Sequence, residues 1–592
     1  MADIIVGIDL GTTNSEVAVV QDGKARVLLV DGDPILPSVV GLADDGRLLV
    51  GQAARNQWVL APERTVRSIK RKMGQDVTVP LGDQTLRPQE ISAMILRKLK
   101  EAAERELGVP VNKAVVTVPA YFNDSQRQAT REAGSLAGLE IVRILNEPTA
   151  AALTYTPSPT GSERFLVYDL GGGTFDVSIV QAEAGVFEVL ASHGDTQLGG
   201  DDFDELLLTH LADEFLELFG FDLRSTPVAR ARLLRAAEAA KRRLSDHPFT
   251  RIEEEFIAEK DGVPLHLNTE ISREEFEALI RPSLDRTLDC VQKALDDARL
   301  TASRIDRVVL VGGSTRTPLI GNLLEERLGQ PASREVHPDL CVALGAAIQA
   351  AIIAGQDVGA VLVDITPHSL GIKCLEMPND FGYSPNVYKF ATIVKRNTPL
   401  PASRSEAFCT VADSQPSVDI EVYQGESDDV RRNHRVGKFL IEGLARVPAG
   451  NQILVQVDLT LDGMLKVSAR EKATGLLKQI TIENAMARYA VEEREASQAR
   501  LNRMWGTPET AEPIDDAPRL APSVAEGQRE SVQARALLEK AERIRANVSP
   551  EDQVELDRLC EKVRVAVTDR VWGDLKTASA ELADVLFYLE DA

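Results

Sequence analysis

The sequence predicts a multidomain protein in which an α/β block comes first, an antiparallel β block follows and helices complete the chain. Its 592 residues are several times the length of a typical domain. Short apolar segments alternate with long helical patterns from Ile4 to about Ala354, which is typical of layered α/β structure. Between Ile365 and Ile482 the apolar residues instead recur at every second position, a period that favours strands.

The composition is typical of a globular protein. Hydrophobic residues make up 44% of the chain and charged residues 27%, so each domain can bury a core. The net charge of -24 opposes binding to nucleic acid or anionic membranes. The longest apolar stretch, residues 342–354, is too short to span a bilayer, and residues 1–3 lack the basic start of a signal peptide. We therefore expect a cytoplasmic protein that binds neither nucleic acid nor membranes.

The five cysteines lie far apart and include no C-x-x-C pair. This spacing fits neither a disulfide framework nor a zinc site.

Individual elements can be placed within the first two blocks. Helical patterns predict helices over residues 88–107 and 202–219. In the β block, the alternation over residues 418–422 puts three apolar side chains on one face of a strand. The Asp-Gly pair at 462–463 predicts a hairpin turn.

The C-terminal region is predicted to contain two helical parts joined by a tether. Residues 506–527 contain four prolines among acidic and small residues, which prevents a continuous helix and predicts a flexible linker. Ser549 and Pro550 then supply an N-cap and a first-turn proline, so a helix should begin there.

Three glycine-centred turns, in residues 6–14, 167–176 and 308–316, each follow an apolar strand. Glycines allow close approach to phosphate, and successive N–H groups in such turns bind anions. Aspartates end the first two strands and suit Mg²⁺, which prefers oxygen ligands and retains several waters. The Asp-Leu-Gly core recurs after about 160 residues, so we expect two similar halves around one nucleotide. A Walker-type phosphate loop is absent from the sequence.

Together with residues 117–124, 146–152 and 198–204, these turns resemble the 70-kDa heat-shock (DnaK-like) chaperone family. The resemblance runs from Ile4 to about Ile482. It implies the fold class, a multidomain α/β + β + α chain. The implied domains are an actin-like ATPase domain over 1–356, a linker over 357–366, an antiparallel β-sandwich peptide-binding domain over 367–483, and a helical lid over 484–592 interrupted by the tether.

The resemblance also implies roles, position by position, in the ATPase domain. It implies water-mediated Mg²⁺ binding by Asp9 and Asp169. It implies catalytic roles for Lys70, Glu147, Thr174 and Asp176. It implies nucleotide contacts from a larger set: Gly11, Thr12, Thr13, Asn14, Gly171, Gly172, Gly173, Gly199, Gly200, Glu238, Lys241, Arg242, Ser245, Gly312, Gly313, Ser314, Arg316 and Asp339. Positions 238, 241, 242 and 245 share one helix face.

In the β block the resemblance implies a peptide cleft formed by Ile372, Phe408, Val411, Val418 and Ile420. The alternative is that these are ordinary core residues of the sandwich. An extended peptide would bond through its backbone and fill an apolar pocket with one side chain.

The residues implied to couple the domains or receive a J-domain are Pro119, Arg127, Arg143 and Asp364. The implied ligands are ATP or ADP, Mg²⁺ and K⁺. The implied partners are unfolded polypeptides, a J-domain co-chaperone and a nucleotide exchange factor.

Several positions depart from the family pattern. Residues 70–91 are shorter than in long members, and Leu340 and Cys341 stand where a glutamate and an alanine are common. The linker over 359–364 has less apolar area for docking. Residues 376–388 lengthen a loop beside the cleft, Val411 is larger than usual, and the Glu-Glu-Val-Asp ending of eukaryotic cytosolic members is absent from the sequence.

The sequence thus predicts an ATP-driven chaperone of bacterial type that binds extended apolar segments. A specialised paralogue with few clients and weakened lid or linker coupling is the nearest alternative. A small-molecule kinase on the same ATPase fold would need no β block, and an actin-like filament protein would leave the last two blocks without a role.

Overall fold

The computed structural model describes residues 4–155, 161–333, 337–356, 358, 360–375, 388–461, 465–481, 491–506 and 550–569, with nine further positions between 534 and 582. The chain divides into two compact units, Met1–Thr507 and Pro508–Ala592. The architecture is mixed α/β, with several sheets and helices, as the sequence predicts.

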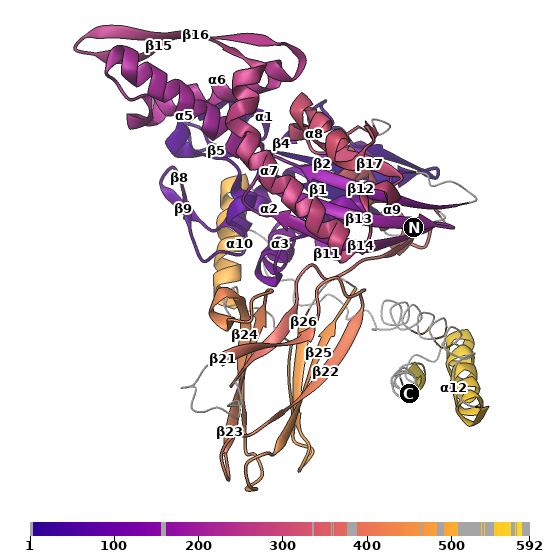
Figure 1. Cartoon of the computed structure of the whole chain (residues 1–592). Coiled ribbons are helices and arrows are strands. Elements are labelled where there is room, and N and C mark those ends of the chain that lie inside the picture. Colours follow the sequence, from indigo (N-terminus) through magenta and orange to yellow (C-terminus); the bar gives the residue numbers. More distant parts are fainter. Residues whose placement is uncertain are drawn as a thin grey trace, which may run out of the picture. The chain divides into compact units, whose positions relative to one another are not determined.

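Two six-stranded sheets form the centre of the first unit (Figure 1). The first sheet contains β1 (Ile5–Leu10), β2 (Asn14–Gln21), β3 (Lys24–Val27), β4 (Leu36–Pro37), β10 (Lys113–Val118) and β11 (Glu140–Asn146). The second contains β12 (Ser162–Leu170), β13 (Phe175–Glu183), β14 (Val186–Asp195), β17 (Arg307–Val311), β18 (Ala332–Ser333) and β19 (Val361–Val363).

The two sheets repeat one strand order, β11-β10-β1-β2-β3 in the first and β18-β17-β12-β13-β14 in the second. The corresponding strands also run in the same relative directions. Strand β1 is parallel to β10 and antiparallel to β2. In the second sheet, β12 is parallel to β17 and antiparallel to β13. The recurrence of the Asp-Leu-Gly core along the sequence therefore corresponds to two sheet halves of one topology.

Helices surround these sheets. Their bounds are α1 (Gln52–Trp58), α2 (Pro88–Leu107), α3 (Asp124–Leu136), α4 (Glu147–Ala152), α5 (Gly200–Phe219), α6 (Pro227–Asp246), α7 (Arg273–Asp297), α8 (Pro318–Leu328) and α9 (Cys341–Ile353). The helix predicted over 88–107 has these bounds in the structure, and the one predicted over 202–219 begins two residues earlier, at Gly200. The smaller sheets contain β5 (Val40–Leu42), β6 (Leu48–Val50), β7 (Thr65–Val66), β8 (Val79–Leu81), β9 (Gln84–Leu86), β15 (Phe249–Lys260) and β16 (Val263–Ser272).

Helix α9 packs closely against both α4 and β1 because glycines stand at the points of contact. A Cβ atom on Gly345 would lie 1.8 Å from the backbone oxygen of Ala150, and one on Gly7 would lie 2.1 Å from the backbone nitrogen of Ala347. Neither backbone can move away without disturbing the buried cluster around it.

Gly345→Ala is therefore expected to lower the free energy of unfolding of the first block by about 3 kcal/mol through overpacking. Chemical denaturation followed by circular dichroism measures this change. The matched control is Gly321→Ala in α8, where a Cβ would meet nothing within 4 Å and should stabilise the helix by about 0.5–1 kcal/mol. Equal stability of the two variants would contradict the packing described for α9.

The β block consists of two four-stranded antiparallel sheets with orders β21-β20-β23-β24 and β22-β25-β26-β27. Their bounds are β20 (Leu370–Leu375), β21 (Tyr388–Val394), β22 (Ala402–Cys409), β23 (Ser417–Gln424), β24 (His434–Glu442), β25 (Gln452–Leu459), β26 (Leu465–Glu471) and β27 (Leu477–Thr481). Burial alternates along β23 in the predicted period of two. The predicted turn at 462–463 lies outside the described residues, as do residues 376–387 of the lengthened loop predicted over 376–388.

The segment between the blocks adds a strand that the sequence does not predict. Strand β19 pairs in parallel with the edge strand β14, with Val361 opposite Val186 and Val363 opposite Glu188. The linker therefore extends the second central sheet.

Helix α10 (Val491–Trp505) follows the β block and packs on α2 and α3 (Figure 1). The second unit contains α12 (Pro550–Asp569), which begins where the Ser549-Pro550 pair predicts a helix. Almost all of the predicted tether lies outside the described residues. Among the residues that are described, no helix is both long enough and apolar enough to cross a membrane.

Candidate functional site

A cleft of about 1660 Å³ lies where the glycine turns of the two central sheets meet. Most of the predicted nucleotide, metal and catalytic residues line it: Asp9, Gly11, Thr12, Thr13, Asn14, Lys70, Glu147, Asp169, Gly171, Gly172, Thr174, Glu238, Lys241, Arg242, Ser245, Gly312, Gly313, Ser314, Arg316 and Asp339. These residues are spread over 330 positions of the sequence, and the fold brings them to one cavity.

Four predicted residues, Gly173, Gly199, Gly200 and Asp176, are absent from the lining and support it from behind. A Cβ on Gly199 would lie 2.5 Å from the backbone of Gly172, and one on Gly200 would lie 2.4 Å from the Ser314 hydroxyl oxygen. The amide of Gly200 also donates to the carbonyl of Gly171 at 3.0 Å. The absence of side chains here lets the start of α5 close against the second turn.

The first two glycine turns approach each other at Thr13 and Gly172. A Cβ on Gly172 would lie 1.8 Å from Thr13 Oγ1, and this hydroxyl is buried without a hydrogen-bond partner among the described residues. A buried hydroxyl without a partner is costly. The turns therefore present a polar group suited to a ligand with hydrogen-bonding oxygens.

Lys70 and Glu147 form a buried ion pair at the floor of the cleft. Lys70 lies in a 3₁₀ turn (Ile69–Lys72) and its Nζ is 2.5 Å from Glu147 Oε1 at the start of α4. Burial raises the pKa of Glu147 to about 7, although Lys70 opposes the shift. Burial alone would lower the pKa of Lys70, but Glu147 and Asp9 raise it above its usual range. Lys70 therefore carries its positive charge into the cleft.

The carboxylates around Lys70 outnumber its single charge. Burial raises the pKa of Asp9, Asp169 and Asp176, and Lys70 acts against each of these shifts. Thr117 Oγ1 donates to Asp9 at 2.8 Å, and the Tyr121 amide donates to Asp176 at 3.1 Å.

Such an excess of buried negative charge is relieved by a divalent cation. No group of three or more His, Cys, Asp or Glu side chains within the described part of the chain is arranged to hold a metal by itself. The site thus fits Mg²⁺ held largely through water and phosphate.

The opposite wall of the cleft is formed by one face of α6 and the third glycine turn. Lys241 Nζ donates to the Gly200 carbonyl at 2.9 Å and pairs with Asp204 at 2.8 Å. Glu238 accepts from Arg55 of α1 at 2.5 Å, which ties the two sides of the cleft together. Arg316 pairs with Asp339 at 2.6 Å.

Sequence reasoning missed three groups at this site. Ser68 donates to Asp201 at 2.5 Å, and Arg71 donates to both carboxylate oxygens of Asp202, at 3.0 and 2.9 Å. Both contacts join the Lys70 turn to the start of α5. Glu16, on β2, is buried and lines the cleft. The available signal for Glu16 was a lone acidic residue directly before the apolar run of residues 17–20.

The predicted peptide residues gather in the β block with unequal exposure. Ile372 and Ile420 are buried in its core, Phe408 and Val418 pack against that core half-buried, and Val411 is 61% exposed. The two isoleucines are thus placed as sandwich core residues, whereas Phe408, Val418 and Val411 are accessible.

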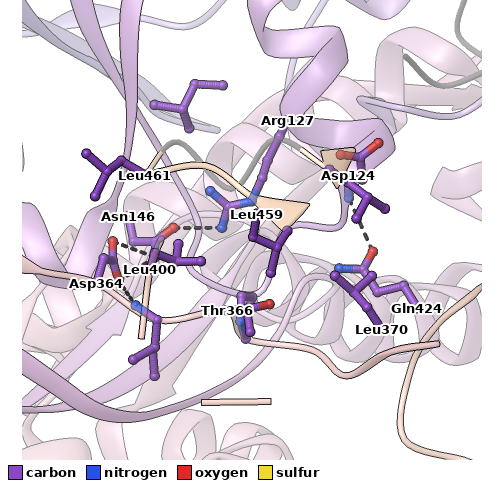
Figure 2. A pocket seen from close by; sticks show the side chains of 14 residues that line it. Asp124, Arg127, Asn146, Asp364, Thr366, Leu370, Leu400, Gln424, Leu459 and Leu461 are labelled. Atoms are coloured by element: carbon purple, nitrogen blue, oxygen red, sulfur yellow. Dashed lines mark hydrogen bonds between the residues drawn. The ribbon is translucent and has the colours of Figure 1, made fainter. Parts of the chain in front are cut away.

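A polar network joins the α/β block to the β block (Figure 2). Arg127 Nη2 donates to Asn146 Oδ1 at 2.7 Å, and Asn146 Nδ2 donates to both Asp364 oxygens at 3.0 Å. Close by, the Asp124 amide donates to Gln424 Oε1 at 3.3 Å. All five of these residues surround a small cavity together with Leu400 and other apolar side chains.

The two other predicted coupling residues lie beside this network. Arg143 lies on β11, where its Nε is buried without a hydrogen-bond partner among the described residues and its charge acts on Asp364. Pro119 accepts from the Phe122 amide at 3.1 Å, in the connection leading to α3. Asn146, which the sequence analysis did not assign to coupling, is the residue that bridges Arg127 and Asp364.

Three histidines lie at contacts between the same two blocks. His368 contacts the Tyr121 carbonyl at 3.0 Å, His434 contacts Ser125 Oγ at 3.1 Å, and His193 contacts Asp297, which also binds Arg396 at 2.7 Å. Burial lowers the pKa of His368 to about 4 and lowers the pKa of His193 and His434. The contacts therefore favour neutral imidazoles.

Acidification from about pH 7 to about pH 5 is accordingly expected to weaken contact between the two blocks. Separated blocks release His368 to its ordinary pKa of 6.5. The separated form then binds more protons, and the contact loses stability as the pH falls from 6.5 toward 4. Small-angle scattering across this range measures the change. His368→Gln keeps a donor for the Tyr121 carbonyl and should reduce the pH dependence; an unchanged profile would contradict this role.

Helix α10 is held on α2 by buried polar and aromatic contacts. Arg500 donates to Glu90 at 2.5 Å, where Glu90 is only 1% exposed. Trp505 Nε1 donates to Glu101 at 2.6 Å, and the Arg97 guanidinium lies 4.8 Å from the centre of the Trp505 ring. The first helix of the predicted lid region thus packs on the α/β block.

Comparison with known proteins agrees with this arrangement of a cleft between two similar sheets followed by a β block. The family model described as Hsp70 protein matches residues 5–81 and 75–587. The chaperone protein DnaK of Thermotoga neapolitana is 48% identical over 483 residues, which cover 80% of this chain and 79% of the relative. The chain therefore belongs to the Hsp70 family of ATP-dependent chaperones, which are ATPases.

Proposed function

We propose that the cleft binds and hydrolyses ATP and that the β block binds extended apolar segments of unfolded polypeptides. The observation that carries the first part is the burial of Lys70 and Glu147 as a pair beneath two glycine turns, in a cavity that also contains Asp9 and Asp169. The Hsp70 family in general uses ATP and ADP with Mg²⁺. The cation, when bound, neutralises phosphate charge.

In this proposal each group acts on a distinct part of the reaction. The turns around Thr13 and Gly172 direct N–H and hydroxyl groups at the phosphates. The Lys70 ammonium stabilises charge that develops on the transferred phosphoryl group. Glu147, with a pKa of about 7, can accept a hydrogen bond or a proton from the attacking water. Thr174 and Asp176 help to position that water.

Adenosine would be held between α6 and the third glycine turn. Glu238, Lys241, Arg242 and Ser245 lie on one helix face and line the same wall as Gly313. Asp9 and Asp169 would hold Mg²⁺ through its waters. K⁺ is a further proposed ligand.

Peptide binding is proposed for the accessible edge of the β block at Phe408, Val418 and Val411, with Ile372 and Ile420 beneath it. Backbone bonds to a peptide are independent of its sequence, so this mode gives broad specificity. The proposal includes a J-domain co-chaperone and a nucleotide exchange factor as partners, with neither nucleic acid nor membrane among them. It also includes a cytoplasmic location.

ATP hydrolysis measured with and without an unfolded peptide tests both activities at once. Stimulation by peptide is expected because binding and hydrolysis are linked reciprocally. Absence of hydrolysis would overturn the nucleotide assignment, whereas hydrolysis without any peptide effect would overturn the peptide assignment.

Val418→Phe is expected to weaken peptide binding about tenfold and to remove stimulation, because the added ring occupies space on the half-buried face of β23. Fluorescence anisotropy with an apolar extended peptide measures the affinity. Val263→Phe makes the same change on the exposed strand β16 and should leave peptide affinity as it is. Unaltered affinity of Val418→Phe would show that this face is ordinary core.

A further inference from the structure

Glu16 is a buried acid for which the proposed mechanism has no role. It lies on β2, is 2% exposed and lines the nucleotide cleft. Its carboxylate makes no hydrogen bond or ion pair with any other residue that the structure describes. A carboxylate removed from water without a partner is unfavourable. The fold therefore retains at this position a group whose partner arrives from outside the protein.

The internal repeat shows what Glu16 corresponds to. Strands β1 and β2 place Glu16 directly opposite Asp9, and strands β12 and β13 place Asp176 directly opposite Asp169. The number of residues between the two members is the same in both pairs. Each central sheet thus has a pair of opposed acids beside its glycine turn; both acids of the first pair line the cleft, and Asp169 of the second pair does.

Like charges that are directly opposite on neighbouring strands destabilise a sheet unless a counter-charge lies between them. In the second half, the Tyr121 amide donates to Asp176. In the first half, Thr117 donates to Asp9, and no such donor to Glu16 is found among the described residues. Thr13, between Asp9 and Glu16 in sequence, has a buried hydroxyl that also lacks a partner among them. Among the described residues, each half therefore has one acid with a donor and one without, Glu16 in the first half and Asp169 in the second, and both unpartnered acids line the cleft.

We propose that Glu16 is a third acidic side chain of the magnesium site and that, with Asp9 and Asp169, it accepts hydrogen bonds from the water around the cation. The described acids do not form a group that holds a metal directly, so Glu16 acts through water. This inference rests on the nucleotide and magnesium site proposed above. It concerns how tightly the cation is held rather than whether the cleft binds nucleotide.

The test is the affinity of the full-length ADP complex for Mn²⁺, measured by electron paramagnetic resonance as a substitute for Mg²⁺. Loss of an outer carboxylate of this kind typically weakens metal binding about tenfold or more. Glu16→Gln should show that loss, and Glu16→Asp, which keeps the charge, should stay within about threefold of the parent. Asp22→Asn removes one charge in the exposed turn that follows the same strand and should leave Mn²⁺ affinity unaltered.

Thermal melting without nucleotide or metal shows whether each variant folds, and ADP binding without metal shows whether the nucleotide site is intact. If ADP does not bind to the parent, the proposed function fails rather than this inference. If ADP binds and Glu16→Gln keeps parental Mn²⁺ affinity, the inference is overturned. It is also overturned if only the dependence on K⁺ changes, because Glu16 would then serve a monovalent ion. If Glu16→Gln does not fold, Glu16→Ser takes its place, and parental Mn²⁺ affinity in that variant overturns the inference as well.

Discussion

Lys70→Ala is expected to slow ATP hydrolysis by about a hundredfold to a thousandfold, because loss of one buried electrostatic stabiliser costs about 2.7–4 kcal/mol in the transition state. The variant also leaves Glu147 without its partner, since the two side chains form a buried pair at 2.5 Å. Single-turnover hydrolysis of prebound ATP measures the chemical step separately from nucleotide binding and product release.

Lys72→Ala is the matched control for Lys70→Ala. Lys72 lies in the same 3₁₀ turn, but its side chain is exposed. The Lys72→Ala variant should hydrolyse ATP at the parental rate and retain the parental affinity for nucleotide. A Lys70→Ala variant that hydrolyses ATP within about threefold of the parent would show that the charge acts elsewhere.

Asp364→Ala is expected to uncouple the two blocks of the first unit. Asp364 is buried and accepts two hydrogen bonds from Asn146, which in turn accepts from Arg127. Removing the carboxylate leaves the Asn146 amide without its acceptor and takes away the negative charge that acts on the buried Arg127 guanidinium. The contact should weaken by about 3 kcal/mol, which reduces the population of joined blocks roughly a hundredfold.

Hydrogen exchange of the β19 and β14 amides reports on this contact, because β19 ends at Val363, next to Asp364, and pairs with β14. Peptide stimulation of hydrolysis should be lost together with protection of these amides. Asp364→Asn keeps one acceptor oxygen and should have a smaller effect. Retention of both stimulation and amide protection in Asp364→Ala would show that the network does not join the blocks.

The parts of the structure that depend on local pattern could be predicted from the sequence. Helix α2 has the predicted bounds, and the glycine turns lead to a single cleft. The period of two along β23 also appears as alternating burial. Each of these features follows from residues close together in the chain or from a repeated motif, so the physical cause is visible in the sequence itself.

Contacts between distant segments could not be predicted in the same way. The pairing of Arg396 with Asp297 depends on how two blocks meet, and neither residue has a distinctive neighbourhood in the sequence. Glu16 was overlooked because a single acid in a strand is usually read as a solvent-facing position, and only the pairing of β1 with β2 shows that it faces Asp9. The roles of the cleft residues were implied by the resemblance to a family. The hydrogen bonds around Asn146 could be identified only in the structure.

The pairing of β19 with β14 also has a consequence for self-association. A sheet whose last strand is uncovered offers a row of unpaired N–H and C=O groups to any extended chain. The linker pairs with the edge of β14 at Val186, Phe187 and Glu188, so it covers that part of the edge. Without β19, the second central sheet would have an open edge that includes the buried Phe187. Glu188 would then place a charge next to Phe187 on this edge, which disfavours pairing of two such edges.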